Sequence, residues 1–598
     1  MSIIYVIYTF IYCINGRYSD QGGKKMSVIF KFNKHRKQKD DYVWEQPSKT
    51  PMHPIVRLLF SLLITVIFGA VYFYVELPAI NIHALEFYWF LFLLCVVYAA
   101  SRIVLGRVRA GGARGYLTYV KDTMKIPCII AVVLILVVVL GLGSGLALFR
   151  ASAYSALLKP ETGDFSEDVT EISLDQIPML DSSSANNLAN RKLGDLSDLV
   201  SQFFVSEDSS QINYKGKPVR VTYLGYDGFF KWWKNRDKGL PAYMIIDMVT
   251  QDVQVVRLDE GMKVSPYELF NRNLSRQLRF QYPTLMFDNV NFEIDEEGTP
   301  YWVASVTEKK IGLFNGDDIK GAVLMNAITG KSQYYAVKDV PTWVDRVYSA
   351  DLLISQYNNH GAYIHGFLNS YFGQTDCTVT TDGYNYIAMD DDVWLYTGIT
   401  SITEDRGNIG FILVNQRTKE AKYYACAGAE EFSAMSSAEG MVQQYNYDAT
   451  FPLLLNIADE PTYFMALKDT AGLVKMYAMV NVQQYQIVAT GQTVQECQES
   501  YRSLLLEKGI LTEEEADQSA LTDTAAKTQT AGQIQEIRSA AMNGDTYYFF
   551  LLAGDPHYYT INARECPLAV ILNTGDNVTI TYTGEQQEIT PATTIIRK

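Results

Sequence analysis

The chain has few of the residues that build catalytic and metal centres. It holds six histidines and seven cysteines in 598 residues, and beyond residue 150 histidine occurs only at His360, His365 and His557. Cysteine this sparse excludes a disulfide framework, although it leaves room for one or two bridges. No phosphate-binding loop, dinucleotide fingerprint, zinc-protease, serine-hydrolase or S-x-x-K motif occurs in a useful context. We therefore expect no catalytic residue, no cofactor and no metal ion.

Charge is divided unevenly along the chain. Residues 1–150 carry 17 Lys and Arg against 7 Asp and Glu, whereas the remainder carries 34 against 59. The long apolar runs also lie in the basic part, which is typical of a membrane protein with an acidic soluble region. Because an acidic region repels phosphate backbones, we expect no nucleic acid partner.

Three apolar segments predict a membrane anchor at residues 54–150. Residues 58–75 and 126–149 contain no charged side chain, and each is long enough to cross about 30 Å of hydrocarbon at about 1.5 Å per residue. Residues 87–101 are shorter, but a snorkelling Arg102 would lengthen that span; a re-entrant segment is the alternative. We expect three helices in the lipid bilayer, without the buried charge or broken segment of a transporter.

The positions of Lys and Arg predict the orientation of this anchor. Five basic residues occur within 31–39 and six within 102–125, whereas the link 76–86 has none. Basic loops stay on the cytoplasmic side. We therefore expect a cytoplasmic basic tail at residues 1–53 and place residues 151–598 outside the plasma membrane.

The first 25 residues are a poor signal peptide. Residues 1–16 are apolar but have no basic segment before them and no convincing cleavage site. Residues 21–25 can be written as purine-rich, ribosome-binding-like codons that lead into the codon of Met26. We interpret Met26 as the start of the protein and residues 1–25 as untranslated.

Composition divides the outer region into four parts. Residues 151–213 are polar and predict an extended connector with one helix near 182–193. Residues 214–510 alternate short Tyr, Val, Thr and Phe runs with helical segments, which predicts an α+β region with antiparallel sheets. Residues 511–533 have almost no large apolar side chain and predict a linker. Residues 534–598 have a strand pattern of their own, and we expect a small OB-like or SH3-like barrel.

An internal repeat is the strongest signal in the outer region. The segment 321–336 recurs at 410–425 with an offset of 89 residues, and the same frame appears earlier and again in a shortened copy near Asn481. In each copy a strand ends at Asp or Asn, whose side chain can start a turn. The turn positions are Asp247, Thr250, Asn326, Thr329, Asn415 and Thr418.

A helix is expected after each of these hairpins. Ser265-Pro266-Tyr267-Glu268 has the pattern of a capping box. Pro341 predicts the start of the second helix, residues 430–445 the third, and Thr493 with Glu496 the fourth. We expect each helix to cover one face of its own sheet.

The segment Asn326-Ala-Ile-Thr329-Gly330 resembles the closing turn of PepSY-like domains, small units in which a helix packs on an antiparallel sheet. The turns at Asp247 and Asn415 keep the Thr but lack the Gly. The resemblance covers roughly residues 215–508. The whole chain also resembles a family of large membrane-anchored proteins of Gram-positive gut bacteria, through phrases such as 381–386 (TDGYNY) and 464–469 (FMALKD). This resemblance implies a cell-envelope location and no reaction.

Two clusters could carry chemistry. His365, His360 and Cys377 resemble the signature of L,D-transpeptidases, but Asp376 replaces the Gly before the Cys and would raise the pKa of the thiol. We favour a loop between repeat units, with a cell-wall-acting cysteine enzyme as the alternative. The three aspartates at 390–392 lack the spacing of a calcium loop, and we expect a hairpin turn there.

The densest aromatic cluster is a candidate partner-binding surface. It consists of Phe229, Phe230, Trp232 and Trp233, interleaved with lysines. The alternative, which we favour, is that these rings complete the core of the first sheet. With no convergent catalytic set, we expect a non-catalytic envelope protein that binds or regulates another envelope protein, a protease or a cell-wall polymer.

Overall fold

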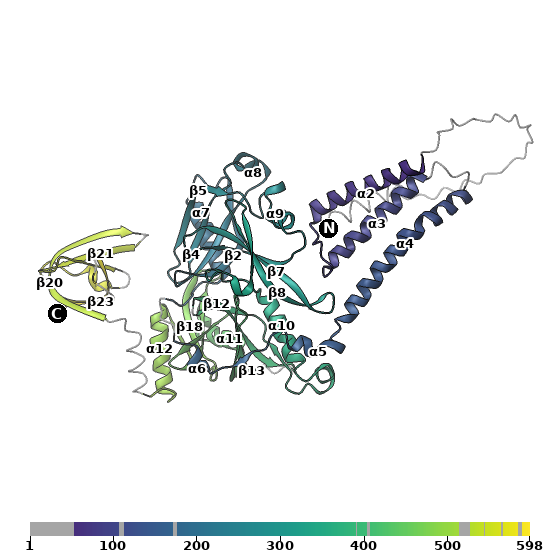
Figure 1. Ribbon diagram of the computed structural model, residues 1–598. Coiled ribbons are helices and arrows are strands. Elements are labelled where there is room, and N and C mark those ends of the chain that lie inside the picture. Colours follow the sequence, from purple (N-terminus) through teal and green to yellow (C-terminus); the bar gives the residue numbers. More distant parts are fainter. Residues whose placement is uncertain are drawn as a thin grey trace, which may run out of the picture. The chain divides into compact units, whose positions relative to one another are not determined.

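The computed structural model describes residues 53–106, 113–171, 176–389, 391–403, 407–512, 527–542, 545–563, 566–583, 586 and 589–597. The basic tail, with Met26 as its proposed start, lies outside these residues apart from His53. Within the described part the chain is a mixture of helices and mostly antiparallel sheets (Figure 1), which confirms the α+β class.

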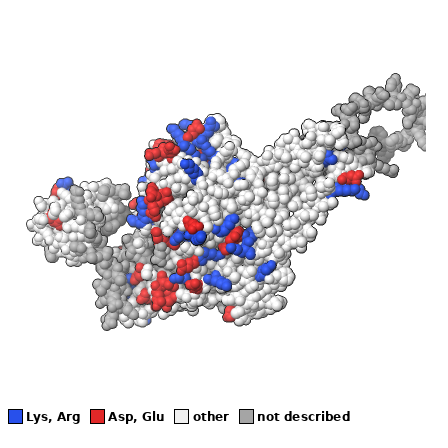
Figure 2. Space-filling model, viewed as in Figure 1, with Lys and Arg blue, Asp and Glu red and all other residues white. Residues whose placement is uncertain are grey.

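The membrane anchor consists of long apolar helices. Within the described residues, three are long and apolar enough to cross a membrane. They are α2 (Pro54–Glu76), α3 (Leu85–Gly106) and α4 (Ala113–Ser144). Because α3 is a full-length helix, the re-entrant alternative for residues 87–101 is wrong. Their surface is nearly free of charge, whereas the β-rich part carries Lys, Arg, Asp and Glu together (Figure 2).

The β-rich part begins immediately after the anchor, so the prediction of an extended connector at 151–213 is wrong. The segment holds α5 (Ala147–Ser155), β1 (Glu161–Thr162), α6 (Phe165–Asp168) and α7 (Ser182–Gly194). Leu158, Val169 and Ile177 are buried in the core, and β1 pairs in parallel with a strand of the third sheet. The segment is polar in composition, but its few apolar residues pack between the sheets. Helix α7 confirms the predicted helical stretch.

In the described part of the chain, the strands form four open sheets and one barrel. The first sheet has β2 (Phe203–Tyr214), β3 (Lys217–Tyr226), β4 (Leu240–Asp247) and β5 (Val253–Met262). The second has β6 (Met286–Ile294), β7 (Pro300–Ile311), β8 (Asn315–Asn326) and β9 (Ser332–Ala336). Since β2 starts at Phe203, the first unit begins before the predicted boundary at 214.

The third and fourth sheets follow the same plan. The third has β10 (Thr378–Thr380), β11 (Asn385–Met389), β12 (Asp392–Ser401), β13 (Gly407–Asn415) and β14 (Ala421–Ala429). The fourth has β15 (Asp448–Ala449), β16 (Leu453–Ile457), β17 (Glu460–Lys468), β18 (Val474–Asn481) and β19 (Val488–Gly491). In the third sheet β10 and β11 both pair with β12, and in the fourth β15 and β16 both pair with β17. In the first and second sheets a single strand takes this place.

The last hairpin of each sheet is closed by the repeated Asp or Asn. The Asp247 Oδ1 accepts hydrogen bonds from Val249 N and Thr250 N at 2.8 and 2.9 Å. Asn326 and Asn415 accept the two equivalent bonds at 2.8–3.1 Å. The hydroxyls of Thr250, Thr329 and Thr418 each accept from the amide two residues on, at 3.3–3.4 Å. The repeat positions therefore have one local structure, as the sequence predicts.

The fourth turn keeps the Asn without the Thr. Asn481 Oδ1 accepts from Gln484 N at 2.8 Å, and the backbone N of Asn481 donates to Ile487 O at 3.1 Å. This turn is one residue longer than the others, because in the first the equivalent bond joins Asp247 N to Asp252 O.

A helix follows each hairpin, but two of them begin later than predicted. Helix α9 (Leu274–Gln281) is capped by Asn273, not by Ser265. Phe270 has a φ of 53°, which interrupts a helix. The carboxylate of Glu268 accepts from Tyr226 Oη and Trp232 Nε1 in the core instead of returning to the cap.

Helix α10 (Ala350–Ala362) starts at the Ser349 cap rather than at Pro341. The amides of Asp345 and Arg346 donate to Glu293, and those of Val347 and Tyr348 donate to the Gln416 carbonyl. These bonds, to Glu293 of the same unit and to Gln416 of the third, replace helical ones. Helix α11 (Glu431–Met441) and the Thr493 capping box of α12 (Val494–Glu507) lie where the sequence predicts them.

The second and third sheets bury both faces against neighbouring sheets, which corrects the expectation of one helix over each sheet for these two. The fourth sheet packs under α12, as expected. Trp302 and Ala304 of β7 lie in a core shared with the first sheet, whereas Val303 lies in a core shared with the third. In the third sheet, Tyr396 faces the fourth sheet and Leu395 faces the second. Because alternate residues point to opposite faces, strands with apolar residues at every position separate two cores.

The C-terminal strands close into a barrel in the order β20-β21-β22-β24-β23. They are β20 (Lys527–Met542), β21 (Asp545–Leu552), β22 (Tyr558–Asn562), β23 (Asn577–Thr583) and β24 (Ile589–Arg597). Residues 527–533, predicted as linker, pair with β23. The segment has no large apolar side chain to mark it as a strand in the sequence, and its pairing with β23 makes it one. The likeness to OB or SH3 barrels stays a prediction.

We expect Asn326→Ala to destabilise the second sheet, because two backbone amides and the Thr329 hydroxyl lose their acceptor. The loss should be about 1 kcal/mol, or a melting temperature lower by roughly 2–4 °C. Near-UV circular dichroism of the full chain in detergent measures it. Asn326→Asp is the matched control, since Asp247 performs the same task, and an equal loss in both variants would contradict the turn's role.

Candidate functional site

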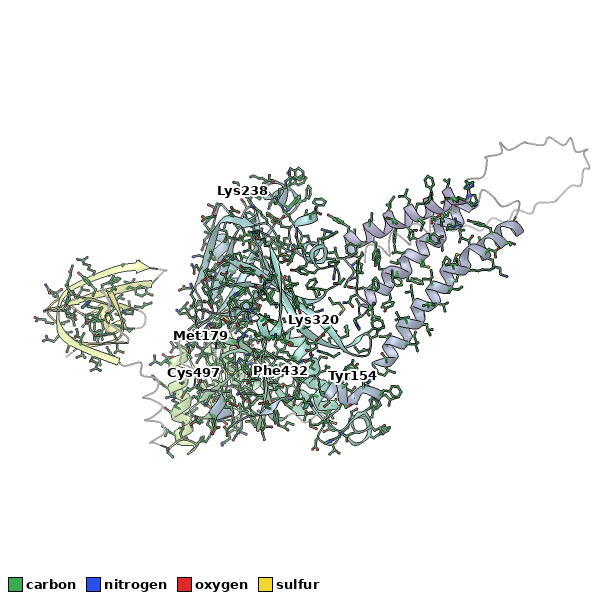
Figure 3. All side chains as sticks on the ribbon, in the orientation of Figure 1. Tyr154, Met179, Lys238, Lys320, Phe432 and Cys497 are labelled. Atoms are coloured by element: carbon green, nitrogen blue, oxygen red, sulfur yellow. The ribbon has the colours of Figure 1, made fainter. Side chains whose placement is uncertain are left out.

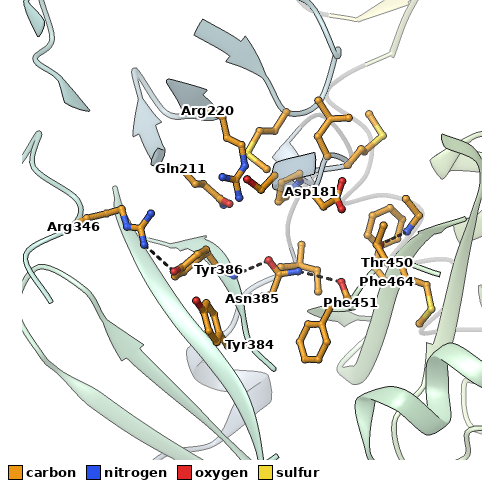
Figure 4. Close-up of a pocket in the computed structure, with 18 residues that line it drawn as sticks. Asp181, Gln211, Arg220, Arg346, Tyr384, Asn385, Tyr386, Thr450, Phe451 and Phe464 are labelled. Carbon is orange, nitrogen blue, oxygen red and sulfur yellow. Dashed lines mark hydrogen bonds between the residues drawn. The ribbon is translucent and has the colours of Figure 1, made fainter. Parts of the chain in front are cut away.

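A cavity of about 450 Å³ lies where three of the repeat units meet. Its walls come from β2 and β3 of the first sheet, β11 of the third, and β16 and β17 of the fourth. The segment 178–182, before and at the start of α7, completes it. The polar residues that line it include Asp181, Gln211, Arg220, Arg346, Tyr384, Asn385 and Tyr386. Figure 4 shows these side chains converging on one space.

Arg220 is the main charged group of this pocket. It is 8% exposed, and its Nη1 donates to Ser209 Oγ at 3.3 Å. Its Nε is fully buried and has no hydrogen-bond partner among the described residues. Burial, followed by the positive charge of Arg346, lowers the pKa of Arg220 to about 10. The guanidinium is therefore still charged at neutral pH and lacks a paired carboxylate in the described part of the chain.

Gln211 lies beside Arg220 on the neighbouring strand and adds a second unused donor. It is 2% exposed, and its Nε2 has no partner among the described residues. A buried donor without an acceptor costs about 1–3 kcal/mol, and a charged one costs more. Both donors belong to side chains that line the same cavity.

The one acidic side chain among the lining residues is already paired. Burial would raise the pKa of Asp181, but hydrogen bonds from Lys468 and Ser184 lower it to about 2. Its Oδ2 accepts from Lys468 Nζ at 2.8 Å, and its Oδ1 accepts from Ser184 N at 3.0 Å. The pair is close to neutral, so Arg220 and Arg346 leave the pocket with positive charge.

Arg346 lies against Tyr386 on the opposite wall. Its Nη2 donates to Tyr386 Oη at 2.9 Å, and its guanidinium carbon lies 4.9 Å from the centre of that ring. Asn385 Nδ2 bridges to the carbonyls of Phe451 and Pro452 at 3.3 Å. These bonds hold an aromatic and amide wall opposite Arg220. The arrangement can bind a ligand in which an anionic group stands next to a planar or apolar group.

Two buried carboxylates lie behind Arg346. Glu293 and Asp345 are 0% and 1% exposed, and Glu293 accepts from the amides of Asp345 and Arg346 at 2.9 and 3.2 Å. Burial raises the pKa of Glu293 to about 7, and burial together with Glu293 raises the pKa of Asp345. The pair joins the second unit to the first, because Asp345 Oδ2 accepts from Asn213 N at 2.7 Å.

The four predicted aromatic residues share one helix but differ in burial. They lie on α8 (Phe229–Asn235), where Trp232 is buried and donates to Glu268 at 2.9 Å. Phe229, Phe230 and Trp233 are exposed. The core interpretation is thus correct for Trp232 alone. Two lysines lie on the same helix, and the guanidinium of Arg236 lies 3.6 Å from the centre of the Trp233 ring.

Cys377 is placed poorly for catalysis. It is 2% exposed, and its sulfur bonds to Asn369 Nδ2 at 3.2 Å and to the Ala362 carbonyl at 3.5 Å. Burial and then Asp376 raise the pKa of its thiol. His365 Nε2 lies 3.0 Å from Asp376 Oδ2, and His360 Nδ1 lies 2.8 Å from the Ser155 carbonyl. Neither imidazole contact leads to the thiol.

The described residues contain no group of three or more side chains that could hold a metal ion. Asp392 is committed to Arg417 through two bonds of 2.6 Å and to Asn415 at 2.8 Å. Asp391 has a φ of 66° and lies in the β11–β12 turn, where the sequence predicts one. Asp390 lies outside the described residues.

The sequence does not predict the residues that line the pocket. Arg220 interrupts an apolar strand between Val219 and Val221, which is the one local signal for it. Tyr384 and Tyr386 lie in the segment 381–386, whose pattern gives no local signal for a pocket. Of the repeat turns, that of Asp247 reaches the pocket, through Met248. The turn positions are structural.

No protein-family model matches the chain, and no curated protein does.

We expect the fully buried Glu293 to make the fold less stable as pH rises. Its pKa is about 7 in the folded chain and about 4.3 in an unfolded one. Between these values the folded state holds a proton that the unfolded state has released, so stability falls as pH rises from about 4.5 to about 7. Glu293→Gln should reduce this fall, and burial of Asp345, which also raises the pKa of that group, should account for what remains; melting temperature against pH measures both.

The control is Glu507→Gln, an exposed residue of α12, which should keep the wild-type profile. A fall of equal size in Glu293→Gln and in the wild type would show that Glu293 does not cause it.

Proposed function

We propose that this chain is a non-catalytic, membrane-anchored binding protein of the bacterial cell envelope, and that the pocket around Arg220 takes an acidic group of its ligand. The observation that carries the proposal is a buried guanidinium without a carboxylate partner in the described part of the chain, at the junction of three units. A buried unpaired charge is costly to the fold, and functional sites are where such costs are retained.

The chemistry of the pocket favours binding over reaction. Arginine is a permanent cation that pairs with carboxylate or phosphate, and it is a poor general base at neutral pH. The lining side chains include no histidine, cysteine or lysine. The buried thiol of Cys377, with its raised pKa, gives the cysteine-enzyme alternative no support.

The ligand classes are another envelope protein, a protease or a cell-wall polymer. Each can present a carboxylate, as an acidic side chain, a chain end or a peptide stem. A nucleic acid is disfavoured, because the region after residue 150 has 59 acidic against 34 basic residues and repels a polyanion. The PepSY-like character of the units and the OB-like or SH3-like character of the barrel belong to the same proposal and rest on the sequence resemblance.

An outward orientation completes the proposal. The bias of Lys and Arg toward residues 31–39 and 102–125 supports it. So does the seating of the β-rich part against the Tyr74 end of α2 and the Ser144 end of α4, which puts it on one side of the anchor.

The pocket is tested with small anions. A tripeptide with a free carboxyl terminus, its C-terminal amide, acetate and inorganic phosphate are added to the full chain in detergent. We expect the free acid to raise the melting temperature and the amide to have little effect. At a hundredfold excess over Kd the stabilisation is about 2.7 kcal/mol. Arg220→Gln should abolish this shift while the ligand-free chain becomes equally or more stable.

Lys238→Gln is the matched control for the loss of one positive charge. Lys238 is exposed and lies on the turn after α8, away from the labelled pocket residue Met179 (Figure 3). If no anion stabilises the wild type more than Arg220→Gln, or if Lys238→Gln removes the shift equally, the pocket is not the site.

The orientation is tested by adding protease to intact cells and to lysed cells. We expect the β-rich part to be cut in intact cells, while a cytoplasmic marker protein stays whole. Cleavage that requires lysis would place this part inside and contradict an extracytoplasmic function.

A further inference from the structure

The segment between α10 and β10, residues 363–376, presents an unusual apolar surface. We call it the aromatic loop. Phe372, Tyr371 and Leu368 are 85%, 68% and 66% exposed, and Ile364 is also exposed. Between 363 and 375 the loop has no Lys, Arg, Asp or Glu, and His365 is its titratable side chain besides the tyrosines. Clustered exposed apolar side chains on a soluble surface mark a contact with a membrane or a partner.

The loop is held in shape by its own polar bonds. Asn369 Nδ2 donates to Thr375 O at 2.8 Å, and Thr375 N donates back to Asn369 Oδ1 at 3.2 Å. The rings of Tyr363, Phe367 and Tyr371 follow one another at 6.4 and 5.0 Å. These contacts hold the loop in a conformation in which apolar side chains, Phe372 among them, face outward.

The root of the loop lies where the third spanning helix ends. Tyr154 of α5 donates to the Gly145 carbonyl at 2.8 Å, so α5 folds back on the end of α4. The ring of Tyr154 lies 6.1 Å from that of Tyr363. His360 Nδ1, in the last turn of α10, lies 2.8 Å from the Ser155 carbonyl. Figure 3 labels Tyr154 at this junction.

The link between α4 and α5 and the first turn of α5 are apolar on their surface. Leu146, Leu148 and Phe149 are exposed, and they continue the lipid-facing surface of α4. Arg150 follows directly, and its Nε donates back to Ser144 O at 3.4 Å. An apolar run that ends in an arginine is typical of the level where hydrocarbon meets headgroups.

We propose that the aromatic loop dips into the leaflet on the β-rich side of the bilayer and forms a second lipid contact beside the anchor. The occupant is lipid, because Tyr154 joins the root of the loop, at the Tyr363 ring, to the end of the spanning helix, at the Gly145 carbonyl. Tyr and Phe suit the interface, where one edge of the ring is dry and the other is hydrated. The one acidic side chain of the loop, Asp376, lies at its β10 end, 3.0 Å from His365 Nε2, and residues 367–373 carry no charge, which lowers the cost of inserting them. The contact does not depend on which side of the membrane faces out, nor on the ligand of the pocket.

The loop would hold the β-rich part at a set tilt against the membrane. Three helices that meet a large domain at one end leave it free to rock about their ends. A lipid contact displaced sideways from α4 opposes that motion, because lifting the loop returns Leu368, Tyr371 and Phe372 to water.

The test places the photoreactive residue p-benzoylphenylalanine at position 372 of the full chain, in vesicles of phosphatidylcholine and phosphatidylglycerol. After irradiation, intact mass spectrometry should show an adduct of one lipid. Position 139 in α4, where Val139 is exposed on a spanning helix, is the positive control. Position 441, where Met441 is exposed at the end of α11, is the aqueous control.

Lipid adducts at 372 and 139 but not at 441 would support the proposal. An adduct at 139 with none at 372, or a protein–protein adduct at 372, would overturn it. As a second measurement, Phe372→Asp in a chain that keeps its melting temperature in detergent should lower the lipid adduct at position 368 at least severalfold. An unchanged adduct at 368 would also count against insertion.

Discussion

One hydrogen-bonding device recurs through the β-rich part and sets its geometry: the side-chain oxygen that closes the last hairpin of each sheet. In the first three units it accepts two backbone amides at 2.8–3.1 Å. The amide of the next residue then donates to the start of the second strand, as from Met248 to Pro218 and from Ala327 to Pro300. The turn thereby fixes the register of three strands. Because a slip of one residue would exchange the two faces of a strand, it also fixes which residues meet which core.

The pocket and the buried carboxylates follow from the stacking of these sheets. Sheets that are apolar on both faces pack against two neighbours, and their polar residues collect where the packing leaves gaps. Arg220 lies in such a gap between three units, and Glu293 with Asp345 lies in another. Both arrangements cost the fold free energy, the first through an unpaired charge and the second through buried acids with raised pKa values. A scaffold optimised for stability alone would lack both arrangements. For this reason we associate the unpaired charge of Arg220 with binding.

The contacts between anchor and β-rich part form a second constraint. Arg276 and Arg279 of α9 donate to the carbonyls of Tyr74 and Leu77 at 3.0 and 2.9 Å. The tip of the β7–β8 hairpin reaches the other helices, with Leu313 O 2.9 Å from His83 Nδ1. Gly145 permits this approach, since a Cβ there would lie 2.1 Å from Asn315. The β-rich part is bonded directly to the three apolar helices rather than held away from them by a flexible stalk, and the proposed lipid-contacting loop fits such seating.

The sequence by itself determined the features that depend on short stretches of chain. Uncharged runs of membrane length predicted α2 and α4, the Asp or Asn with its Thr predicted the turns, and Thr493 with Glu496 predicted a cap, because each is completed within a few residues. The tertiary structure alone decided where α9 and α10 begin, because Glu268 bonds to Tyr226 and Trp232, and the amides of Asp345 and Arg346 bond to Glu293, 36 to 53 residues away in sequence. It also decided that residues 151–213 belong to the core, and that Arg220 meets Arg346 and Tyr386 across 126 and 166 residues of sequence. No local pattern encodes such meetings, since they arise when whole sheets stack.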